Sequence, residues 1–337
     1  MDYATYEKLI SAYDRKINSI KDGANILVAM GVSQPPLIMR DLADRILCGS
    51  LIRPNFYFMH ASDAAERTIL RPEVLDRCGV VATAFQSSHE VKANQKAKLA
   101  GAKTIDILPG NFSNAAATFR DIGIDVAIVQ VSEPQDGLVS LGTNADYMQF
   151  ILDWGSAKTV IAEVNLRMPH VPGKQLFSLD WFDAAVVHES PLMTAKGKVA
   201  TAADQQIAEI VASRINDGDT LQLGVGGIPS AVAARLTDRQ DLGCHSELMS
   251  DAIMSLVKNG NMTGKRKSMW KGRHVYTLAL GSSDLFGWMH NNYQLEGLAA
   301  QICNDPSVIS AQRCMKSVNA AIEVDLWGQV NAEYVHG

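Results

Sequence analysis

The sequence has little cysteine, no long hydrophobic run and no excess of positive charge, and each absence excludes a class of protein. The five cysteines include no C-x-x-C pair, which excludes a disulfide framework or a cysteine-based zinc site and is typical of reduced thiols. No apolar run reaches the roughly 18 residues of a membrane-spanning helix, and residues 1–8 do not resemble the start of a signal peptide. We therefore expect a cytoplasmic protein that is neither secreted nor inserted in a membrane.

The charge balance and the missing motifs narrow the function further. A formal net charge of −5 gives no electrostatic reason to expect a nucleic acid or an anionic membrane as partner. The sequence contains neither H-E-x-x-H nor G-x-S-x-G, and no spacing of histidine and cysteine suits a metal. With 47% hydrophobic and 20% charged residues over 337 positions, the chain has enough apolar residues for a large core, and its length favours two domains.

The spacing of apolar residues predicts helices that alternate with strands. Steps of three and four residues predict helices at 3–21, 37–47, 88–99 and 114–120. Short apolar runs predict strands at 25–30, 55–59, 80–84, 125–131 and 159–164, of which the last two are apolar on both faces, as in the middle of a parallel sheet. This alternation predicts an α/β fold with right-handed crossovers and mostly parallel sheets.

An internal repeat predicts two similarly built domains. Residues 22–31 (DGANILVAMG) align without a gap on residues 217–226 (DGDTLQLGVG), and a helix that begins with proline is expected after each. Chance similarity is the alternative, because strand–helix units of this kind are common. We place the boundary in the irregular region 168–203, which predicts domains at 1–195 and 196–337 with a cleft between them.

The stretch 220–236 is the strongest candidate for a functional site. It predicts a buried strand, a glycine turn and a helix that opens at Pro229, so that free backbone N–H groups point into one spot and attract negative charge. The turn lacks the last glycine of the dinucleotide fingerprint and the Lys-Ser/Thr of a P-loop. Close packing of the helix on the strand is the structural alternative for its glycines.

Glu247 is the acid most clearly placed beside this turn. It follows a predicted strand at 242–246, where side chains project from the carboxyl edge of a parallel sheet towards a ligand. An acid beside an anion-binding turn suggests acyl chemistry, whereas a surface glutamate is the structural alternative. Glu163, at the end of a predicted strand, and Glu323 are the other candidate acids.

Three further features near this region have both a functional and a structural interpretation. His245 is either a base or a structural histidine, and the structural role is the commoner one. Asp251 is expected to cap a helix at 252–258. The basic segment 263–273 either meets phosphate or forms a solvated turn, and the glycines in it favour the turn.

Residues 221–330 closely resemble the acetyl-CoA hydrolase/transferase family, which includes 4-hydroxybutyrate and butyryl-CoA:acetate CoA-transferases. Four blocks occur in the order that the family has them: 221–229 (LQLGVGGIP), 241–251 (DLGCHSELMSD), 304–309 (NDPSVI) and 317–330 (SVNAAIEVDLWGQV). The segments at 125–132, 140–142, 160–165 and 168–169 are similar to the same family. Residues 60–120 depart from the Phe- and Arg-containing pattern usual there, which predicts an altered wall where the acid would bind.

The resemblance implies a fold of two similar open α/β/α domains and a CoA-transferase that moves CoA between a short-chain acyl-CoA and a carboxylic acid by a ping-pong mechanism. Glu247 would be the nucleophile, forming an acyl-glutamyl anhydride and then a glutamyl-CoA thioester. The backbone near Ile322 would run beside CoA. The residues that would line CoA and supply N–H groups to the oxyanion are Gly224, Val225, Gly226, Gly227 and Ile228.

The resemblance also implies a substrate, an oligomeric state and the extent of the second domain. Coenzyme A or acyl-CoA would be a substrate, not a permanently bound cofactor, and a homodimer or larger homo-oligomer is expected. An acyl-CoA hydrolase on the same site and a non-catalytic CoA-binding protein are the alternatives. Family members continue beyond the position of Gly337, so the second domain is expected to be incomplete at its carboxyl end.

Overall fold

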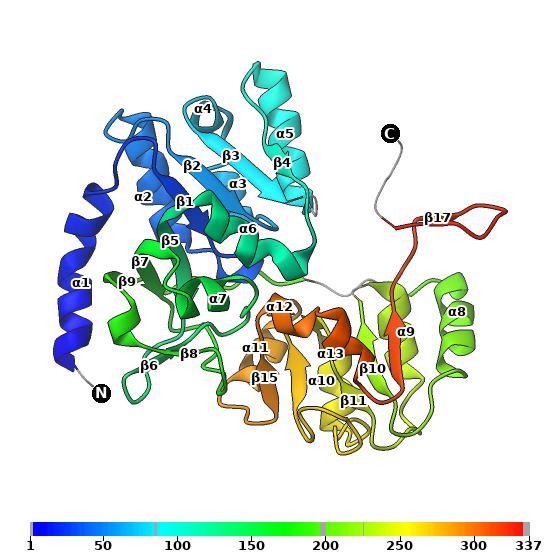
Figure 1. Cartoon of the computed structure of the whole chain (residues 1–337). Coiled ribbons are helices and arrows are strands. Elements are labelled where there is room, and N and C mark those ends of the chain that lie inside the picture. Colours follow the sequence, from blue (N-terminus) through cyan, green and yellow to red (C-terminus); the bar gives the residue numbers. More distant parts are fainter. Residues whose placement is uncertain (1–2, 84–85, 196–199, 225, 333–337) are drawn as a thin grey trace.

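The computed structural model describes residues 3–83, 86–195, 200–224 and 226–332, to which every structural statement below refers. The first half of the chain folds around one sheet of seven strands, and the second half around several shorter groups of parallel strands (Figure 1). This architecture confirms the predicted α/β class with mostly parallel sheets. The position of the boundary between the two predicted domains stays a prediction.

The seven-stranded sheet has the order β4-β3-β2-β1-β5-β7-β9, and all its neighbouring pairs are parallel. Its strands in chain order are β1 (Asn25–Val28), β2 (Asn55–Phe58), β3 (Gly79–Thr83), β4 (Asp106–Leu108), β5 (Ile124–Val131), β7 (Ala157–Val164) and β9 (Ala184–Val187). β5 and β7 are buried along most of their length, as their apolar sequences predicted. A small antiparallel ribbon, β6 (Leu138–Ser140) with β8 (Leu176–Ser178), lies outside this sheet.

Alternate side chains of the central strands pack into two cores, one on each face of the sheet. The first core includes residues of α2 (Pro36–Leu47), α3 (Asp63–Arg67), α4 (Pro72–Leu75) and α5 (Ser88–Ala100). The second includes residues of α6 (Ala115–Ile122) and α7 (Met148–Asp153). α1 (Tyr3–Asn18) contributes to both cores and packs beside β9 at one edge (Figure 1).

The second half is built on short parallel strands. β10 (Thr220–Leu223) lies between β11 (Gly243–Cys244) and β16 (Met315–Val318), and a bridge from His245 to Val275 joins this group to the next pair. The other parallel pairs are β13 (His274–Tyr276) with β15 (Leu295–Gly297), and β12 (Leu248–Met249) with β14 (Leu278–Ala279).

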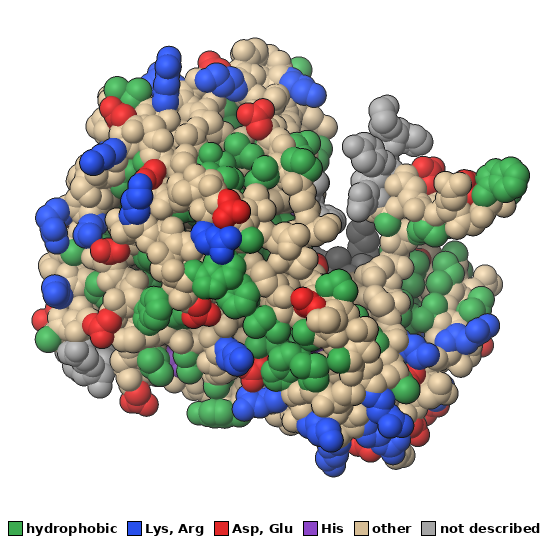
Figure 2. Space-filling view, viewed as in Figure 1, with side chains coloured by type: hydrophobic (Ala, Val, Ile, Leu, Met, Phe, Trp, Pro, Cys, Tyr) green, Lys and Arg blue, Asp and Glu red, His purple; other side chains and the backbone are tan. Residues whose placement is uncertain are grey.

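An antiparallel hairpin of β17 (Glu323–Val324) and β18 (Val330–Asn331) projects away from the body of the second half (Figure 1). Its tip carries Leu326 and Trp327, both of which are exposed, and Figure 2 shows hydrophobic side chains at the end of this projection. The hairpin therefore adds little to the core of the second half.

The helices of the second half surround these strands and share one core with them. The longer ones are α8 (Ala202–Ala212), α9 (Gly227–Ala234), α10 (Asp251–Lys258) and α11 (Ser283–Met289). Two short helices follow β15, namely α12 (Ala300–Cys303) and α13 (Pro306–Ser310), and single 3₁₀ turns occur at Gly31–Ser33, Phe112–Asn114 and Leu179–Trp181.

The predicted elements are present, with shifted ends. The helix predicted at 3–21 ends at Asn18, and the helix predicted at 114–120 follows a 3₁₀ turn and runs over Ala115–Ile122. Position 84, at the end of one predicted strand, lies outside the described residues. The two copies of the sequence repeat contain β1 and β10. Each of these strands has a parallel neighbour on both sides, and a helix follows each in the chain.

The two halves are joined by hydrogen bonds between a loop of the first half and the strand ends of the second. The amides of Ala145 and Asp146 donate to the carbonyl of Thr277, at 2.9 and 3.1 Å. The buried Tyr276 hydroxyl donates to the carbonyl of Gly142 at 2.9 Å and accepts a hydrogen bond from Gln175. Buried polar groups of this kind fix the relative position of the halves, because each would be unpaired if the halves separated.

Candidate active site

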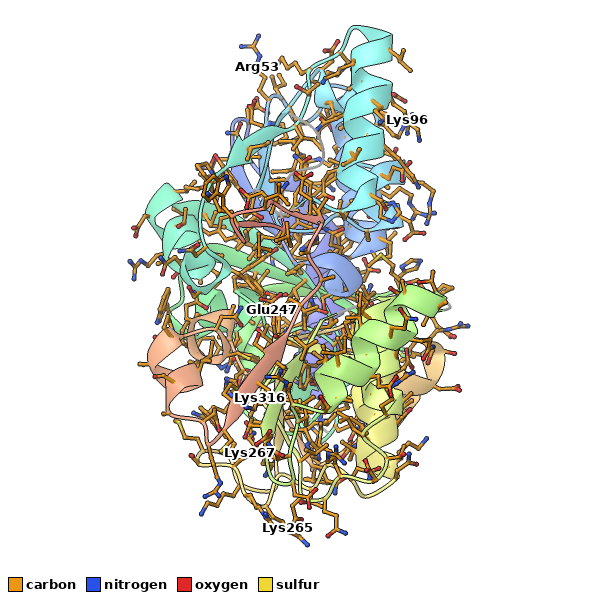
Figure 3. All side chains as sticks on the ribbon, turned by 90° about the vertical axis from the view of Figure 1, so that its right-hand side faces the viewer. Arg53, Lys96, Glu247, Lys265, Lys267 and Lys316 are labelled. Carbon is orange, nitrogen blue, oxygen red and sulfur yellow. The ribbon has the colours of Figure 1, made fainter. Side chains whose placement is uncertain are left out.

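Glu247 lies at the junction of the two halves of the molecule. It occupies the step between β11 and β12, and its side chain is exposed to a cavity of about 880 Å³ that residues of both halves line. Figure 3 shows Glu247 in the middle of the molecule, whereas the labelled Arg53 and Lys265 lie at opposite outer ends. Its position after a parallel strand agrees with the prediction that its side chain projects from the carboxyl edge of a sheet.

The backbone of Glu247 is held by the same segment that joins the halves. Its carbonyl accepts hydrogen bonds from the amides of Thr277 and Leu278, both at 3.0 Å. Because the carbonyl of Thr277 accepts in turn from Ala145 and Asp146 of the first half, the position of Glu247 depends on the contact between the halves.

Asn304 is the side chain in contact with the Glu247 carboxylate. Its Nδ2 donates to Oε2 of Glu247 from the loop after α12. Both residues line the cavity. An amide donor fixes the orientation of a carboxylate without neutralising it, so Glu247 keeps one oxygen free for attack on a carbonyl carbon.

The parts of the glycine turn have different surroundings, and Gly226, Gly227 and Ile228 are not among the residues that line the cavity. Gly224 lines the cavity, but its amide donates to the carbonyl of Val318 in the sheet. No described residue accepts from the amides of Gly226, Gly227 or Ile228, which begin α9, at Gly227 instead of the predicted Pro229. These amides are therefore the free donors of the turn. Val225 lies outside the described residues.

A row of polar side chains continues the cavity wall beyond Gly224. Gln222 on β10 lies in register with Ser317 on β16, and Asn319 follows two residues later. Gln222 Nε2 donates to Asn319 Oδ1 at 2.9 Å, Asn319 Nδ2 donates to Gln222 Oε1 at 3.0 Å, and the Ser317 hydroxyl also donates to Gln222. After these bonds Gln222 keeps one N–H and Asn319 keeps an acceptor lone pair, both on the cavity wall.

His245 has the structural role and not the role of a base. Its Nε2 donates to the carbonyl of Cys303 at 2.8 Å, its Nδ1 accepts from Gln312, and its ring lies 5.8 Å from that of Trp270. Burial lowers the pKa of His245 to about 4, so the ring is neutral at pH 7. Cys303 also lines the cavity, but burial raises the pKa of its thiol and its Sγ donates to the carbonyl of Ser246.

The other candidate acids lie outside this cavity. Glu163 is fully buried, and its Oε2 accepts from the first amides of α2, Leu37 at 2.9 Å and Ile38 at 3.1 Å, while Oε1 contacts His188. Burial raises the pKa of Glu163 to about 7. Glu323 is exposed on the β17–β18 hairpin and accepts from Asn331. Ile322, which is 47% exposed, donates from its backbone to Asn331 and is not among the cavity residues.

One structural prediction from the sequence needs correction, and the prediction of a solvated basic turn holds for Lys265, Arg266 and Lys271 but not for Lys267. Asp251 does not cap α10, because it is the first residue of that helix and its carboxylate accepts from the amide and hydroxyl of Ser282, which joins α10 to α11. In the basic segment 263–273, Lys267 is buried and not solvated: its Nζ donates to the carbonyls of Cys244 at 2.7 Å and Arg273 at 2.8 Å. Burial lowers the pKa of Lys267 to about 8.

The described residues contain no group of three or more His, Cys, Asp or Glu side chains arranged to hold a metal ion. None of the helices in the described ranges combines the length and the hydropathy needed to cross a bilayer. All five cysteines are free.

Comparison with known proteins assigns the family. The family model of the acetyl-CoA hydrolase/transferase N-terminal domain matches residues 1–191, and that of the C-terminal domain matches residues 281–337. The chain belongs to the acetyl-CoA hydrolase/transferase family, as its motifs predicted.

Individual relatives agree with this assignment. A 4-hydroxybutyrate coenzyme A transferase of Clostridium kluyveri is 37% identical over 233 residues, which cover 68% of this chain and 54% of that protein. The chain thus spans about half the length of that curated relative. The crystal structure of RipA from Yersinia pestis has a TM-score of 0.94 at 30% identity and is matched over 99% of this chain and 78% of RipA. A 4-hydroxybutyrate CoA-transferase from Porphyromonas gingivalis has a TM-score of 0.76 at 26% identity and is matched over 96% of this chain and 76% of its own. The fold is therefore that of CoA-transferases.

Several residues of the cavity were not singled out from the sequence. Asn304 stands in a block that carries the resemblance, so a signal for it existed. His60 and the row of Gln222, Ser317 and Asn319 had no distinguishing pattern, because single polar residues at strand ends are common in α/β proteins. Only the pairing of β10 with β16 and the contact of the two halves bring these residues to one cavity.

Proposed function

We propose that the chain is a CoA-transferase that moves CoA between a short-chain acyl-CoA and a carboxylic acid through a glutamyl-CoA thioester on Glu247. The observation that carries the proposal is an exposed carboxylate, held by Asn304, in a cavity lined by both halves of a chain of this family. The names of the relatives, which include a butyryl-CoA:acetate CoA-transferase, support the class of substrates.

The proposed reaction has two acyl-substitution steps, the first at the thioester carbon of the acyl-CoA and the second at the carboxyl carbon of Glu247. The free oxygen of Glu247 attacks the thioester carbon and forms a C–O bond, then the C–S bond breaks and CoA leaves as a thiolate. The product on the protein is an acyl-glutamyl anhydride. The thiolate then attacks the Glu247 carbonyl and releases the acyl group as a carboxylate, which leaves glutamyl-CoA. The acceptor acid reverses both steps. Because each half-reaction exchanges one thioester for another, no external energy source is required.

Donors for the oxyanion come from two sources in this proposal. The free amides of Gly226, Gly227 and Ile228 at the start of α9, together with Val225, are the donors that the family resemblance implies. Asn304 Nδ2 is a side-chain donor already on the nucleophile. Loss of one such donor typically lowers kcat by about 10²–10³-fold, which sets the scale for each of these groups.

The pantetheine arm of CoA has a place along the cavity wall. Gln222 and Asn319 offer one free donor and one free acceptor, which complement a secondary amide, and pantetheine contains two such amides. Gly224 adjoins Asn319: a Cβ at this position would lie 3.2 Å from Asn319 Oδ1. A glycine here therefore leaves room for the ligand and the amide row together.

Trapping of the covalent intermediate tests the proposal. Borohydride reduction of the protein after incubation with an acyl-CoA should convert the Glu247 thioester to an alcohol, which peptide mass spectrometry detects. Glu247→Gln should show neither the modification nor transfer. Glu73→Gln is the matched control, because Glu73 is exposed, pairs with Arg71 and lies outside the cavity. An unmodified Glu247 peptide in protein that binds CoA would favour the alternative of a non-catalytic CoA-binding protein.

Hydrolysis on the same site is the second candidate, because Glu247 is exposed and water reaches it. CoA release that does not depend on an acceptor acid would support a hydrolase, whereas release that rises with the acceptor supports a transferase.

We also propose that the protein acts in the cytoplasm as a homo-oligomer. Its five free cysteines are compatible with a reducing compartment. Light scattering coupled to gel filtration measures the oligomeric state directly.

A further inference from the structure

The buried ring of His245 holds both ends of the segment that carries Asn304. Its Nε2 donates to the carbonyl of Cys303, directly before Asn304 in the chain, at 2.8 Å. Its Nδ1 accepts from the side chain of Gln312, which follows α13, at 3.3 Å. Both ring nitrogens are therefore used within the protein, and the neutral ring has no polar group left for a ligand.

The carbonyl of Cys303 needs a donor from outside its own helix. It is the last residue of α12, which has only four residues, and the last carbonyls of a helix have no partner within it. Cys303 is 2% exposed, so an unpaired carbonyl there would be costly. The start of α12 is held at the boundary of the two halves, where the amide of Ala300 donates to the carbonyl of Asp146 at 3.0 Å (Figure 1). His245 holds the other end.

The bond of His245 is one of three that join successive residues of the same two segments. Sγ of Cys303 donates to the carbonyl of Ser246 at 3.2 Å, and Nδ2 of Asn304 donates to the carboxylate of Glu247. The first two bonds are buried, whereas the third faces the cavity. A shift of the chain at Cys303 would therefore move the amide of Asn304 away from the carboxylate.

His245 itself is fixed to the strands of the second half. Its amide donates to the carbonyl of Leu221 on β10, and the next amide, that of Ser246, donates to the carbonyl of Val275 on β13, both at 3.1 Å. The ring also packs against Trp270. By contrast, the elements that flank Asn304 are short, since α12 has four residues and α13 has five, and helices of this length are not stable alone. The ring therefore transmits the position of the sheet to the segment of Asn304.

We propose that His245 is a positioning residue for CoA transfer, which acts through the Cys303 carbonyl to hold the amide of Asn304 against the attacking carboxylate of Glu247. This inference rests on the proposed transferase function. It predicts that loss of the ring lowers kcat and leaves the KM for acyl-CoA nearly unchanged, because the ring orients the nucleophile and does not bind the ligand.

Steady-state kinetics of single variants give the first test. His245→Leu removes both bonds and should lower kcat by about 10²-fold, the scale of a misplaced reacting group. His245→Gln keeps an N–H donor at the reach of Nε2 and should restore kcat to within about threefold of the unmodified protein. His274→Leu is the matched control and should leave kcat unchanged. His274 is fully buried on β13, neither of its ring nitrogens has a partner among the described residues, and it does not line the cavity.

A double-mutant cycle separates positioning from a general loss of stability. If His245 acts through Asn304, then His245→Leu should change kcat by less than about twofold in the Asn304→Ala protein. Gln312→Leu provides a second cycle, which decides the question if His245→Leu does not fold. Oε1 of Gln312 is buried without a partner, so an apolar side chain is tolerated there. Gln312→Leu should lower kcat by about three- to tenfold, the scale of one hydrogen bond, only when Asn304 is present.

The outcomes distinguish this inference from the function on which it rests. Transfer that Glu247→Gln does not abolish would overturn the proposed function. Glu247-dependent transfer would overturn only the positioning role in any of three cases: the losses in kcat are equal with and without Asn304, His274→Leu is as slow as His245→Leu, or His245→Gln shows no recovery.

Discussion

Asn304 donates a hydrogen bond from Nδ2 to Oε2 of Glu247, and the two residues are 57 positions apart in the sequence. The contact joins the loop after α12 to the segment that connects β11 with β12. Both residues line the cavity between the two halves of the molecule. The backbone carbonyl of Glu247 accepts hydrogen bonds from the amides of Thr277 and Leu278, and the carbonyl of Thr277 accepts in turn from the first half. The proposed nucleophile is thus oriented at its backbone and at its carboxylate by separate parts of the chain.

Replacement of Asn304 tests whether this contact supports catalysis. Asn304→Ala should lower kcat for CoA transfer by about 10²–10³-fold, because the carboxylate loses its orienting donor and the oxyanion loses one hydrogen bond. Steady-state kinetics and the yield of borohydride-trapped Glu247 measure the effect. Asn292→Ala serves as the control, because its side-chain amide donates to Trp288, accepts from Gln294 and does not line the cavity. Activity of Asn304→Ala within twofold of the unmodified protein would contradict the prediction.

Replacement of the polar row tests the place of the pantetheine arm. Gln222→Leu and Asn319→Leu should each raise the KM for acyl-CoA by about 10-fold, the scale of one lost hydrogen bond. Neither should affect an acyl thioester of ethanethiol, which has no amide to bind. Gln205→Leu is the control, because Gln205 accepts from Arg235 on the outer helices α8 and α9 and is not a cavity residue. An equal effect on both thioesters would refute this assignment.

Gly142 should be essential to the junction of the two halves. Its φ is +66°, its carbonyl accepts from Tyr276 and Gln175, and a Cβ would collide with the Met168 side chain and lie 2.9 Å from the carbonyl of Pro169. Gly142→Ala should therefore lower the free energy of unfolding by about 2–4 kcal/mol.

The control for this substitution has the same backbone conformation without the crowding. Gly137 has a φ of +79°, and a Cβ added there would meet nothing within 4 Å, so Gly137→Ala should cost about 1–2 kcal/mol from backbone strain alone. Urea denaturation monitored by tryptophan fluorescence measures both variants. Equal losses in the two variants would show that crowding at the junction has no effect.

Glu163 should make the stability of the protein depend on pH. Burial raises the pKa of its carboxyl to about 7, above the usual 4.5, although Leu37, Ile38 and His188 all favour the charged form. The folded state therefore binds more protons than the unfolded state between these values, so this contribution to stability is largest below pH 4.5 and is lost as the pH rises through 7.

Glu163→Gln removes the titratable carboxyl. The difference in unfolding free energy between the unmodified protein and this variant therefore reports the contribution of Glu163 alone. Relative to the variant, the unmodified protein should lose up to about 3 kcal/mol of unfolding free energy between pH 5 and pH 8. Asp146, whose pKa burial also raises to about 7, is present in both proteins and so cancels from the difference. A difference that stays constant over this range would show that Glu163 remains ionised in the folded protein.

Much of the fold could be predicted because it follows from local patterns. Apolar runs such as 125–131 and 159–164 predicted the central strands β5 and β7, since a strand that is buried on both faces has no polar alternation. Element ends were less predictable. The strand predicted at 242–246 is only the two residues of β11, because the chain leaves one sheet there and joins another at β12.

The candidate site was predictable only in part. Glu247 and Gly224 were named from the sequence, and the structure places both on one cavity. The amide of Gly224 is used in the sheet, because β16 pairs beside β10, and strand order is a property of the whole domain. The buried position of Lys267 also depends on distant carbonyls that no local pattern reveals.

The order of strands and helices and the family could be read from the amino-acid sequence, because hydrophobic periodicity and short motifs are local properties of the chain. The same motifs make Glu247 the candidate nucleophile. Which side chains meet that acid depends on tertiary packing. Asn304 reaches it from a later loop, His60 faces the same cavity from the other half, and Gln222 pairs with Asn319 across two strands. These contacts depend on how sheets and halves pack against each other, and that packing is set by the burial of the whole core and not by any one segment.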